Sequence, residues 1–409
     1  MNKNFYLLAS SSINQFLRFL SVLIFMTYSS PELYSEWVSI ALILQYSLFL
    51  QLGSPQAMHR EIAISFGNDN RHGINNLISP AIMNYFIATV FLSILLFIFN
   101  KSELVIPTLI YISLINLGNL FLLQSRARFE IKRSSLAMLL DGFLLIFCSL
   151  IFVPKYGIVG LILSLCVGSI ANILICFPYS IFTHHVSRNL IDKSLYLFKE
   201  GIPLLLFNFL VLIKDTWDFV LIRFFYFNEF TIYSASHIFV RGISIFGSLM
   251  GLILIPLIAK NFGSSNQLYN TQNILIIKKL TFYLLFTIIL LSLIWIPISD
   301  LFLKNFLSNF YYSKDIIAYR TISGFVGLLI LPFYFFYNSS REPLIAIKYT
   351  ILSIIISFLT FLLLSLFIDI SMSLIISLLT TNLILFVLIS SYFLRNIKIT
   401  QNGYNNSRN

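Results

Sequence analysis

The stretch IPLLLFNFLVLIKDTWDFVLIRFFY, residues 202–226, is apolar over most of its length and carries charged residues in its middle. A helix of this length, at about 1.5 Å per residue, crosses about 30 Å of hydrocarbon. Apolar blocks of similar length recur along the chain, whereas the strands of an outer-membrane barrel would alternate apolar and polar residues in blocks of about ten. The sequence therefore predicts an all-α integral membrane protein.

The composition and the placement of charge support this prediction. Of 409 residues, 58% are hydrophobic and only 11% are charged, whereas a soluble domain is roughly half apolar and about a quarter charged. The net charge of +11 would suggest a nucleic-acid partner in a soluble protein. Here the Lys and Arg residues fall at the ends of apolar blocks, so we interpret them as topological signals and expect no nucleic acid.

Polar segments between the apolar blocks predict about twelve membrane helices. Most Lys and Arg residues fall on the side that holds both termini, so we expect both termini in the cytoplasm and the chain in a bacterial inner membrane. The predicted spans are residues 5–28, 34–57, 78–99, 104–124, 134–154, 157–180, 202–226, 231–258, 278–298, 317–338, 345–368 and 371–394.

One of the longest gaps between spans divides the helices six and six. It predicts an N-terminal bundle over residues 1–180, a cytoplasmic linker over 181–201, a C-terminal bundle over 202–394 and a cytoplasmic polar tail over 395–409. Paired bundles are typical of transporters, in which the substrate site lies where the two repeats meet.

Ionisable residues at membrane depth form the candidate site. Each costs at least about 2.5 to 3.5 kcal/mol near the centre of a membrane helix, so a set of them indicates function by default. The set consists of Arg18, Asp141, Lys214, Asp215, Asp218, Arg223 and Arg241.

The carboxylates of this set have expected partners nearby in sequence. Lys214 lies at the middle of its span and Asp218 follows it at i, i+4 spacing, where a side-chain pair can form. Asp215 shares the same arc of the helix, so that face is not expected to contact lipid. Asp141 lies two turns from Arg133 and is expected to pair with the basic loop there.

The arginines of the set have two alternative roles. Arg18 and Arg241 lack an acidic neighbour at helical spacing, so either a carboxylate of the 202–226 helix neutralises them or they receive an anionic substrate. Arg223 either extends to the membrane interface or lines a cavity. We expect Arg320, at the outer start of its span, to be an interfacial anchor.

A basic loop precedes the 134–154 span. It contains Arg126, Arg128, Lys132 and Arg133. We interpret the loop as an orientation signal that contacts anionic lipid, with substrate docking as the alternative.

No catalytic or cofactor motif is present. A glycine-rich phosphate loop, a Ser, His and Asp set and a Cys and His metal cluster are all absent from the sequence, and no polar segment is long enough for a soluble catalytic domain. We therefore expect a transporter that is not an enzyme and has no cofactor. A proton or sodium gradient is left as a possible driving force, with Asp215 and Asp218 as the groups that would titrate.

Several short motifs, in order along the chain, resemble one transporter family. They are Gly53 with Pro55, Arg60-Glu61, Gly67, Leu122-Leu123-Gln124, Phe129, Tyr156-Gly157-Ile158-Val159-Gly160-Leu161, Lys199-Glu200-Gly201-Ile202-Pro203, Asp218 with Leu221-Ile222, Tyr233-Ser234-Ala235 and Pro256. Their order and spacing resemble the Wzx-type oligosaccharide flippases, polysaccharide biosynthesis proteins of the multidrug, oligosaccharidyl-lipid and polysaccharide exporter superfamily.

The resemblance implies two six-helix bundles forming a V around a central cavity. It also implies alternating access and a polyprenyl-pyrophosphate-linked oligosaccharide, the repeat unit of O-antigen, lipopolysaccharide or capsule, as cargo. Membrane lipids and the polymerase and chain-length proteins of the pathway are the implied partners. Cationic cavity residues matter in this family, which here points to Arg18, Lys214 and Arg241. The chain differs in being short and in lacking two extra carboxy-terminal helices.

Two other functions remain open at this stage. A drug or toxin exporter of the same superfamily would share the fold, but its cavity is expected to be acidic so that it can receive cationic drugs. A polysaccharide polymerase has similar hydropathy but is expected to carry a large outer loop with catalytic basic residues.

Overall fold

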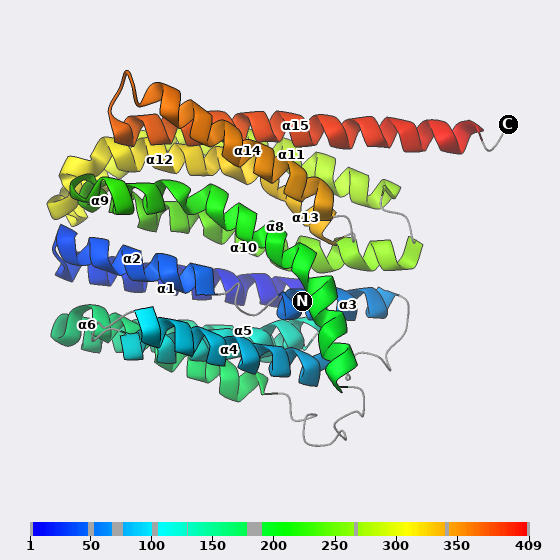
Figure 1. The fold of residues 1–409 in the computed structure, drawn as a ribbon, viewed down its shortest axis with the longest axis horizontal. Helices are drawn as coiled ribbons and strands as arrows, with labels where there is room; N and C mark the ends of the chain where they lie inside the picture. Colours follow the sequence, from blue (N-terminus) through cyan, green and yellow to red (C-terminus); the bar gives the residue numbers. More distant parts are fainter. Residues whose placement is uncertain are drawn as a thin grey trace. The chain divides into compact units, whose positions relative to one another are not determined.

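The structure is a computed structural model that describes residues 3–47, 53–67, 77–99, 105–128, 130–177, 190–265, 269–339 and 343–406 (Figure 1). Within these ranges the chain forms helices and no strand, which confirms the all-α prediction. The elements are α1 (Lys3–Tyr28), α2 (Pro31–Ser47), α3 (Ser54–Gly67), α4 (Ile78–Phe99), α5 (Val105–Ala127), α6 (Ile131–Cys176), α8 (Leu190–Phe225), α9 (Phe227–Ser234), α10 (Ser236–Ser265), α11 (Thr271–Phe306), η3 (Ser308–Ser313), α12 (Lys314–Gly327), η4 (Leu328–Ile330), α13 (Leu331–Ser339), α14 (Pro343–Leu364) and α15 (Ile370–Asn406).

The helices cross a membrane about twelve times. Among the described residues, eight stretches are long and apolar enough to span it, formed by α1, α5, α6, α8, α11, α12 with α13, α14 and α15. Helix α6 has 46 residues and leaves helical geometry at Gly157, so it provides two spans. The other predicted spans, 34–57, 78–99 and 231–258, overlap with α2, α4 and α10.

The chain divides into two compact units, which we call unit 1 (Met1–Phe209) and unit 2 (Leu210–Asn409). In unit 1, α1 and α5 pack along α6, and α3 and α4 pack against α5. In unit 2, α10, α11 and α15 pack around α12, and α14 packs on α15. The division falls within α8, so this helix belongs to both units.

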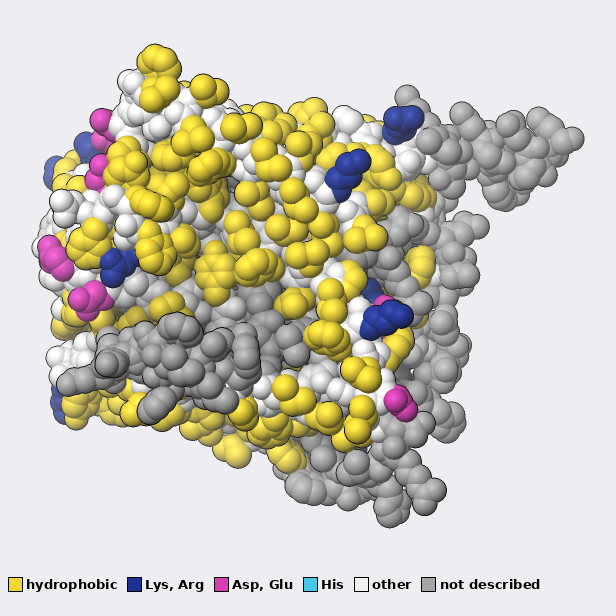
Figure 2. Space-filling view, in the orientation of Figure 1, with side chains coloured by type: hydrophobic (Ala, Val, Ile, Leu, Met, Phe, Trp, Pro, Cys, Tyr) yellow, Lys and Arg dark blue, Asp and Glu magenta, His cyan; other side chains and the backbone are white. Residues whose placement is uncertain are grey.

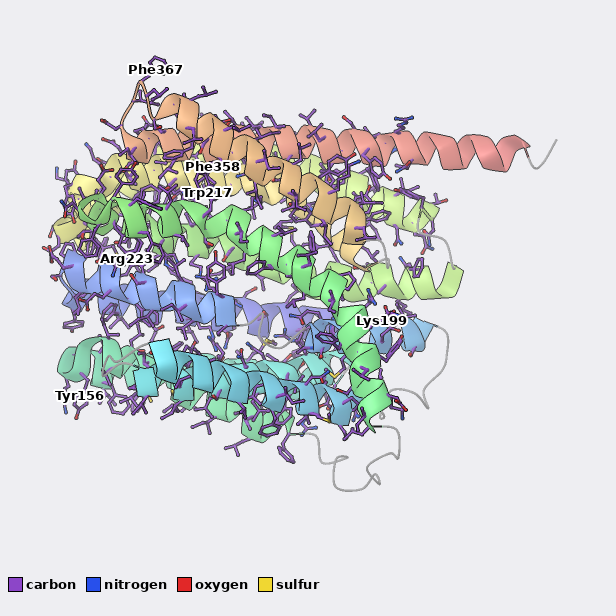
Figure 3. All side chains as sticks on the ribbon, viewed as in Figure 1. Tyr156, Lys199, Trp217, Arg223, Phe358 and Phe367 are labelled. Atoms are coloured by element: carbon purple, nitrogen blue, oxygen red, sulfur yellow. The ribbon has the colours of Figure 1, made fainter. Side chains whose placement is uncertain are left out.

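Different contacts hold the two halves of α8. In unit 1, Arg60 of α3 forms an ion pair with Glu200, with 2.6 Å between Nη2 and Oε2. In unit 2, the Trp217 ring packs edge-on against Phe358 of α14, with ring centroids 6.4 Å apart (Figure 3). Each unit is therefore attached to its own part of one helix.

Apolar side chains cover the outside of the helices. Figure 2 shows hydrophobic side chains along the described helices and charged side chains mostly toward their ends. On α11, Phe282 and Leu293 are each 72% exposed. Such surface would be unfavourable in water and is suited to contact with lipid tails.

Several helices continue past the bounds of the predicted spans, which mark the apolar blocks. The predicted 34–57 span is two helices, α2 and α3, and α3 extends into the predicted loop as far as Gly67. Residues 190–201 of the predicted linker are the first turns of α8, and residues 395–406 of the predicted tail are helical. Helical hydrogen bonds are internal, so a helix does not end where the hydrocarbon does. Residues 181–189 lie outside the described ranges.

Replacement of Gly53 by Ala is expected to destabilise unit 1 more than replacement of Gly157. Both glycines have positive φ, +71° and +54°, which costs other residues about 1 to 3 kcal/mol. At Gly53 a Cβ would also lie 2.2 Å from the carbonyl oxygen of Gly201, whereas at Gly157 the nearest atom, in Leu33, is 3.9 Å away. Thermal unfolding in detergent measures the difference, and equal losses of Tm would contradict the close approach of α3 and α8.

Candidate functional site

In unit 1, Arg18 of α1 pairs with Asp141 of α6. The Nη2 and Nε atoms of Arg18 lie 2.6 and 3.2 Å from Oδ2 of Asp141, and Asn14 donates to the same oxygen from 2.9 Å. The carboxylate fits because residue 168 is Gly: a Cβ there would lie 2.2 Å from Oδ1 of Asp141. The Asp141 side chain is 3% exposed and that of Arg18 is 24% exposed. A partly accessible cation therefore covers a buried carboxylate.

The expected pairing of Asp141 with the basic loop is wrong. Arg133 instead forms an ion pair with Glu130, with 3.2 Å between Nη1 and Oε2. It also donates hydrogen bonds to the carbonyl oxygens of Ile175 and Phe177 at the end of α6. Those carbonyls lack helical partners, so Arg133 serves as a cap.

In unit 2, a second pair is fully buried. Nε of Arg320, in α12, lies 2.7 Å from Oδ2 of Asp218 in α8, and Tyr233 of α9 donates to the same oxygen from 2.7 Å. Nη2 of Arg320 donates to the carbonyl oxygen of Asp215 from 3.0 Å. The side chains of Arg320 and Asp218 are 4% and 0% exposed. These buried hydrogen bonds link α8, α9 and α12, and a substrate cannot reach them.

The interfacial role expected for Arg320 is therefore wrong, and so is a pair between Lys214 and Asp218. Asp218 pairs with Arg320 instead. Nζ of Lys214 lies 2.6 Å from Oδ1 of Asp215. Lys214 also donates to Oδ1 of Asn382 in α15 from 3.1 Å. Lys214 is 6% exposed and Asp215 is 53% exposed. In this pair the carboxylate is the accessible partner.

The remaining candidates lie nearer helix ends or surfaces. Arg223 stacks over the rings of Phe227 and Phe230, 4.5 and 5.5 Å from their centroids, at the end of α8 (Figure 3). Phe224 beside it is 78% exposed. Aromatic residues with a cation are typical of a membrane interface. Arg241, on α10, has an exposed side chain.

Sequence reasoning missed the partners contributed by distant segments. Arg320 is 102 residues from Asp218, and Arg18 is 123 residues from Asp141. One signal was available for Arg320: the 202–226 helix carries carboxylates deep in the membrane, and such groups need a cation. No local spacing identified which cation.

Comparisons with known proteins agree with this architecture. No protein-family model and no curated protein matches the chain. Among solved structures, a mutant of the Vibrio cholerae MATE transporter VcmN has a TM-score of 0.76 at 14% identity, covering 97% of this chain and 96% of that one. The MATE transporter ClbM, solved with Rb⁺, has a TM-score of 0.66 at 13% identity, covering 98% and 97%.

A third structure comes from Pyrococcus furiosus. It is described as a MOP superfamily transporter whose reversed binding-pocket polarity suggests a different function. Its TM-score is 0.71 at 16% identity, and the match covers 97% of this chain and 95% of that one.

The chain is therefore a multi-pass membrane protein with the fold of MATE transporters.

Replacement of Arg320 by Met is expected to destabilise unit 2 strongly, by about 3 to 5 kcal/mol, because it leaves Asp218 buried and unpaired. The double change Arg320→Met with Asp218→Asn is expected to recover most of the loss. Lys314→Met is the control, because Lys314 lies 3.8 Å from Asp300 in an exposed pair and is expected to matter little. Tm values in detergent measure all three, and a single variant as stable as wild type would contradict the buried pair.

Proposed function

We propose that this chain is a flippase that translocates a polyprenyl-pyrophosphate-linked oligosaccharide across a bacterial inner membrane by alternating access. The headgroup crosses the membrane while the prenyl tail stays in lipid. The observation that carries the proposal is Arg18, an accessible cation at membrane depth that is held in place by a buried carboxylate.

The geometry of Arg18 suits a phosphate cargo. A guanidinium has five N–H donors in a planar fork, and Asp141 engages it through Nε and Nη2 at a single oxygen. Donors therefore remain for the oxygens of a second anion. Because Asp141 balances part of the charge, Arg18 is stable in the membrane when no cargo is present, and it need not move to receive one.

The MOP fold is compatible with an anionic cargo. The Pyrococcus furiosus transporter is described as having a binding pocket of reversed polarity. In this chain the accessible cation Arg18 would receive an anion, whereas an exporter of cationic drugs would present carboxylates there. A polymerase remains the alternative within the same pathway.

Ion coupling is part of the proposal. Asp215 is the accessible member of its pair on α8 and lies against buried Lys214. Protonation of Asp215, or a sodium ion bound to it, would weaken its hold on Lys214 and link the cycle to an ion gradient. The structure of ClbM with Rb⁺ is a precedent for a cation bound to this fold.

In the proposed orientation, both termini lie in the cytoplasm, on the side with most Lys and Arg residues. The polymerase and chain-length proteins of the pathway would act on the translocated cargo at the outer surface, and anionic lipids would contact the cytoplasmic basic residues.

Deletion of the gene tests the proposed function. We expect loss of surface polysaccharide and accumulation of lipid-linked repeat units whose headgroups are protected from a membrane-impermeant glycosidase or oxidant added to intact spheroplasts. A plasmid copy is expected to restore both.

The other outcomes identify the alternatives. Single unpolymerised units exposed on the outside would indicate a polymerase. Normal polysaccharide together with increased sensitivity to cationic drugs would indicate a drug exporter. Either result would remove the flippase proposal.

A further inference from the structure

Arg126, at the last turn of α5, has an environment unlike that of the paired cations. Its Nε atom is fully enclosed and has no hydrogen-bond partner in the described part of the chain. Its Nη2 atom contacts the thioether sulfur of Met138 in α6, a weak acceptor. Among the described residues no carboxylate lies within ion-pair distance of Arg126. By contrast, Arg18 and Arg320 each have an aspartate within 2.7 Å.

A histidine from a third helix lies near this cation. His59 belongs to α3, and burial together with the charge of Arg126 lowers the pKa of His59 to about 4. At neutral pH the imidazole is therefore uncharged and offers one N–H donor. Met58, next to His59 in the chain, and Met138, which contacts Arg126, both belong to one buried apolar cluster. The surroundings provide donors and apolar surface but no countercharge among the described residues.

A partly buried guanidinium without a countercharge is unfavourable, because desolvation removes its hydration and nothing replaces it. The usual resolution is an anion from outside the protein. Arg126 is only partly buried as a residue, although its Nε atom is enclosed, so an anion would approach through the terminal nitrogens. A site of this kind would favour a ligand whose several oxygens match the planar fork of an arginine, which is the chemistry of phosphate.

We propose that Arg126, with His59 beside it, binds the phosphate or pyrophosphate group of a lipid at the junction of α3, α5 and α6 in unit 1. The identity of that lipid as cargo rests on the proposed function, whereas the binding itself does not.

The position of the site on α6 suggests its role. Met138, which contacts Arg126, precedes Asp141 by about one helical turn, or roughly 5 Å. Asn14 donates to both the carbonyl oxygen of Met138 and the carboxylate of Asp141. Arg126 and Arg18 therefore contact residues on adjacent turns of α6. Arg126 is the first docking point for the charged group, and Arg18 is the next.

Thermal unfolding of the full chain in detergent tests the site, with inorganic pyrophosphate as the probe at constant ionic strength. Pyrophosphate is expected to raise the Tm of wild type by about 2 °C or more at saturation. It is expected to leave Arg126→Met unchanged, because methionine fills the apolar pocket without offering a donor. Lys132→Met, which removes an exposed cation of the same basic loop, is the control and is expected to respond as wild type does.

No shift in wild type, or an equal shift in Arg126→Met, would overturn the proposal. If Arg126→Met does not fold, His59→Leu takes its place, and it is expected to reduce the shift by half or more; an undiminished shift would remove His59 from the site.

The source of the phosphate is distinguished in nanodiscs. If pyrophosphate stabilises wild type in phosphatidylcholine and phosphatidylglycerol gives no Arg126-dependent effect, the site serves a pyrophosphate cargo. If phosphatidylglycerol alone gives an Arg126-dependent rise in Tm, the phosphate is that of a bulk lipid. If the chain binds pyrophosphate through Arg126 but deletion of the gene leaves surface polysaccharide intact, the phosphate site is supported and the flippase proposal is contradicted.

Discussion

The structure depends on the cost of placing charge inside a membrane. Each ionised group at that depth is unfavourable unless it is paired or hydrated, and the chain meets this constraint within each unit. Arg18 with Asp141 in unit 1 and Arg320 with Asp218 in unit 2 neutralise charges contributed by different helices. The pairs therefore fix which helices pack together, in addition to the nonspecific burial of apolar surface.

The pairs differ in which side chains they leave accessible. Arg320 and Asp218 are sealed and join three helices. In the Arg18–Asp141 pair the arginine is accessible and the carboxylate is buried. In the Lys214–Asp215 pair the carboxylate is accessible and the lysine is buried. Unit 1 thus offers a positive group and unit 2 a carboxylate. In the proposed function, the anionic cargo would act on the Arg18 pair and the coupling cation on the Asp215 pair.

The sequence predicts the fold class, because the fold class follows from local composition and helical length. The predicted span 78–99 has the bounds of α4. The partners were not predictable, since Arg18 and Asp141 are 123 residues apart and helical spacing reports only neighbours within a turn or two. Even within one helix, spacing did not identify the partner of Lys214. The i, i+4 spacing favours Asp218, but Asp218 pairs with Arg320 and Lys214 pairs with Asp215.

The most direct test of the account compares Arg18→Gln, Asp141→Asn and the double variant for stability and for restoration of surface polysaccharide in the deletion strain. Each single change breaks the pair and is expected to lower Tm, and the double variant is expected to recover it. If Arg18 binds the cargo, the double variant is stable and inactive. A double variant that is both stable and fully active would show that the pair is only structural and would contradict the account.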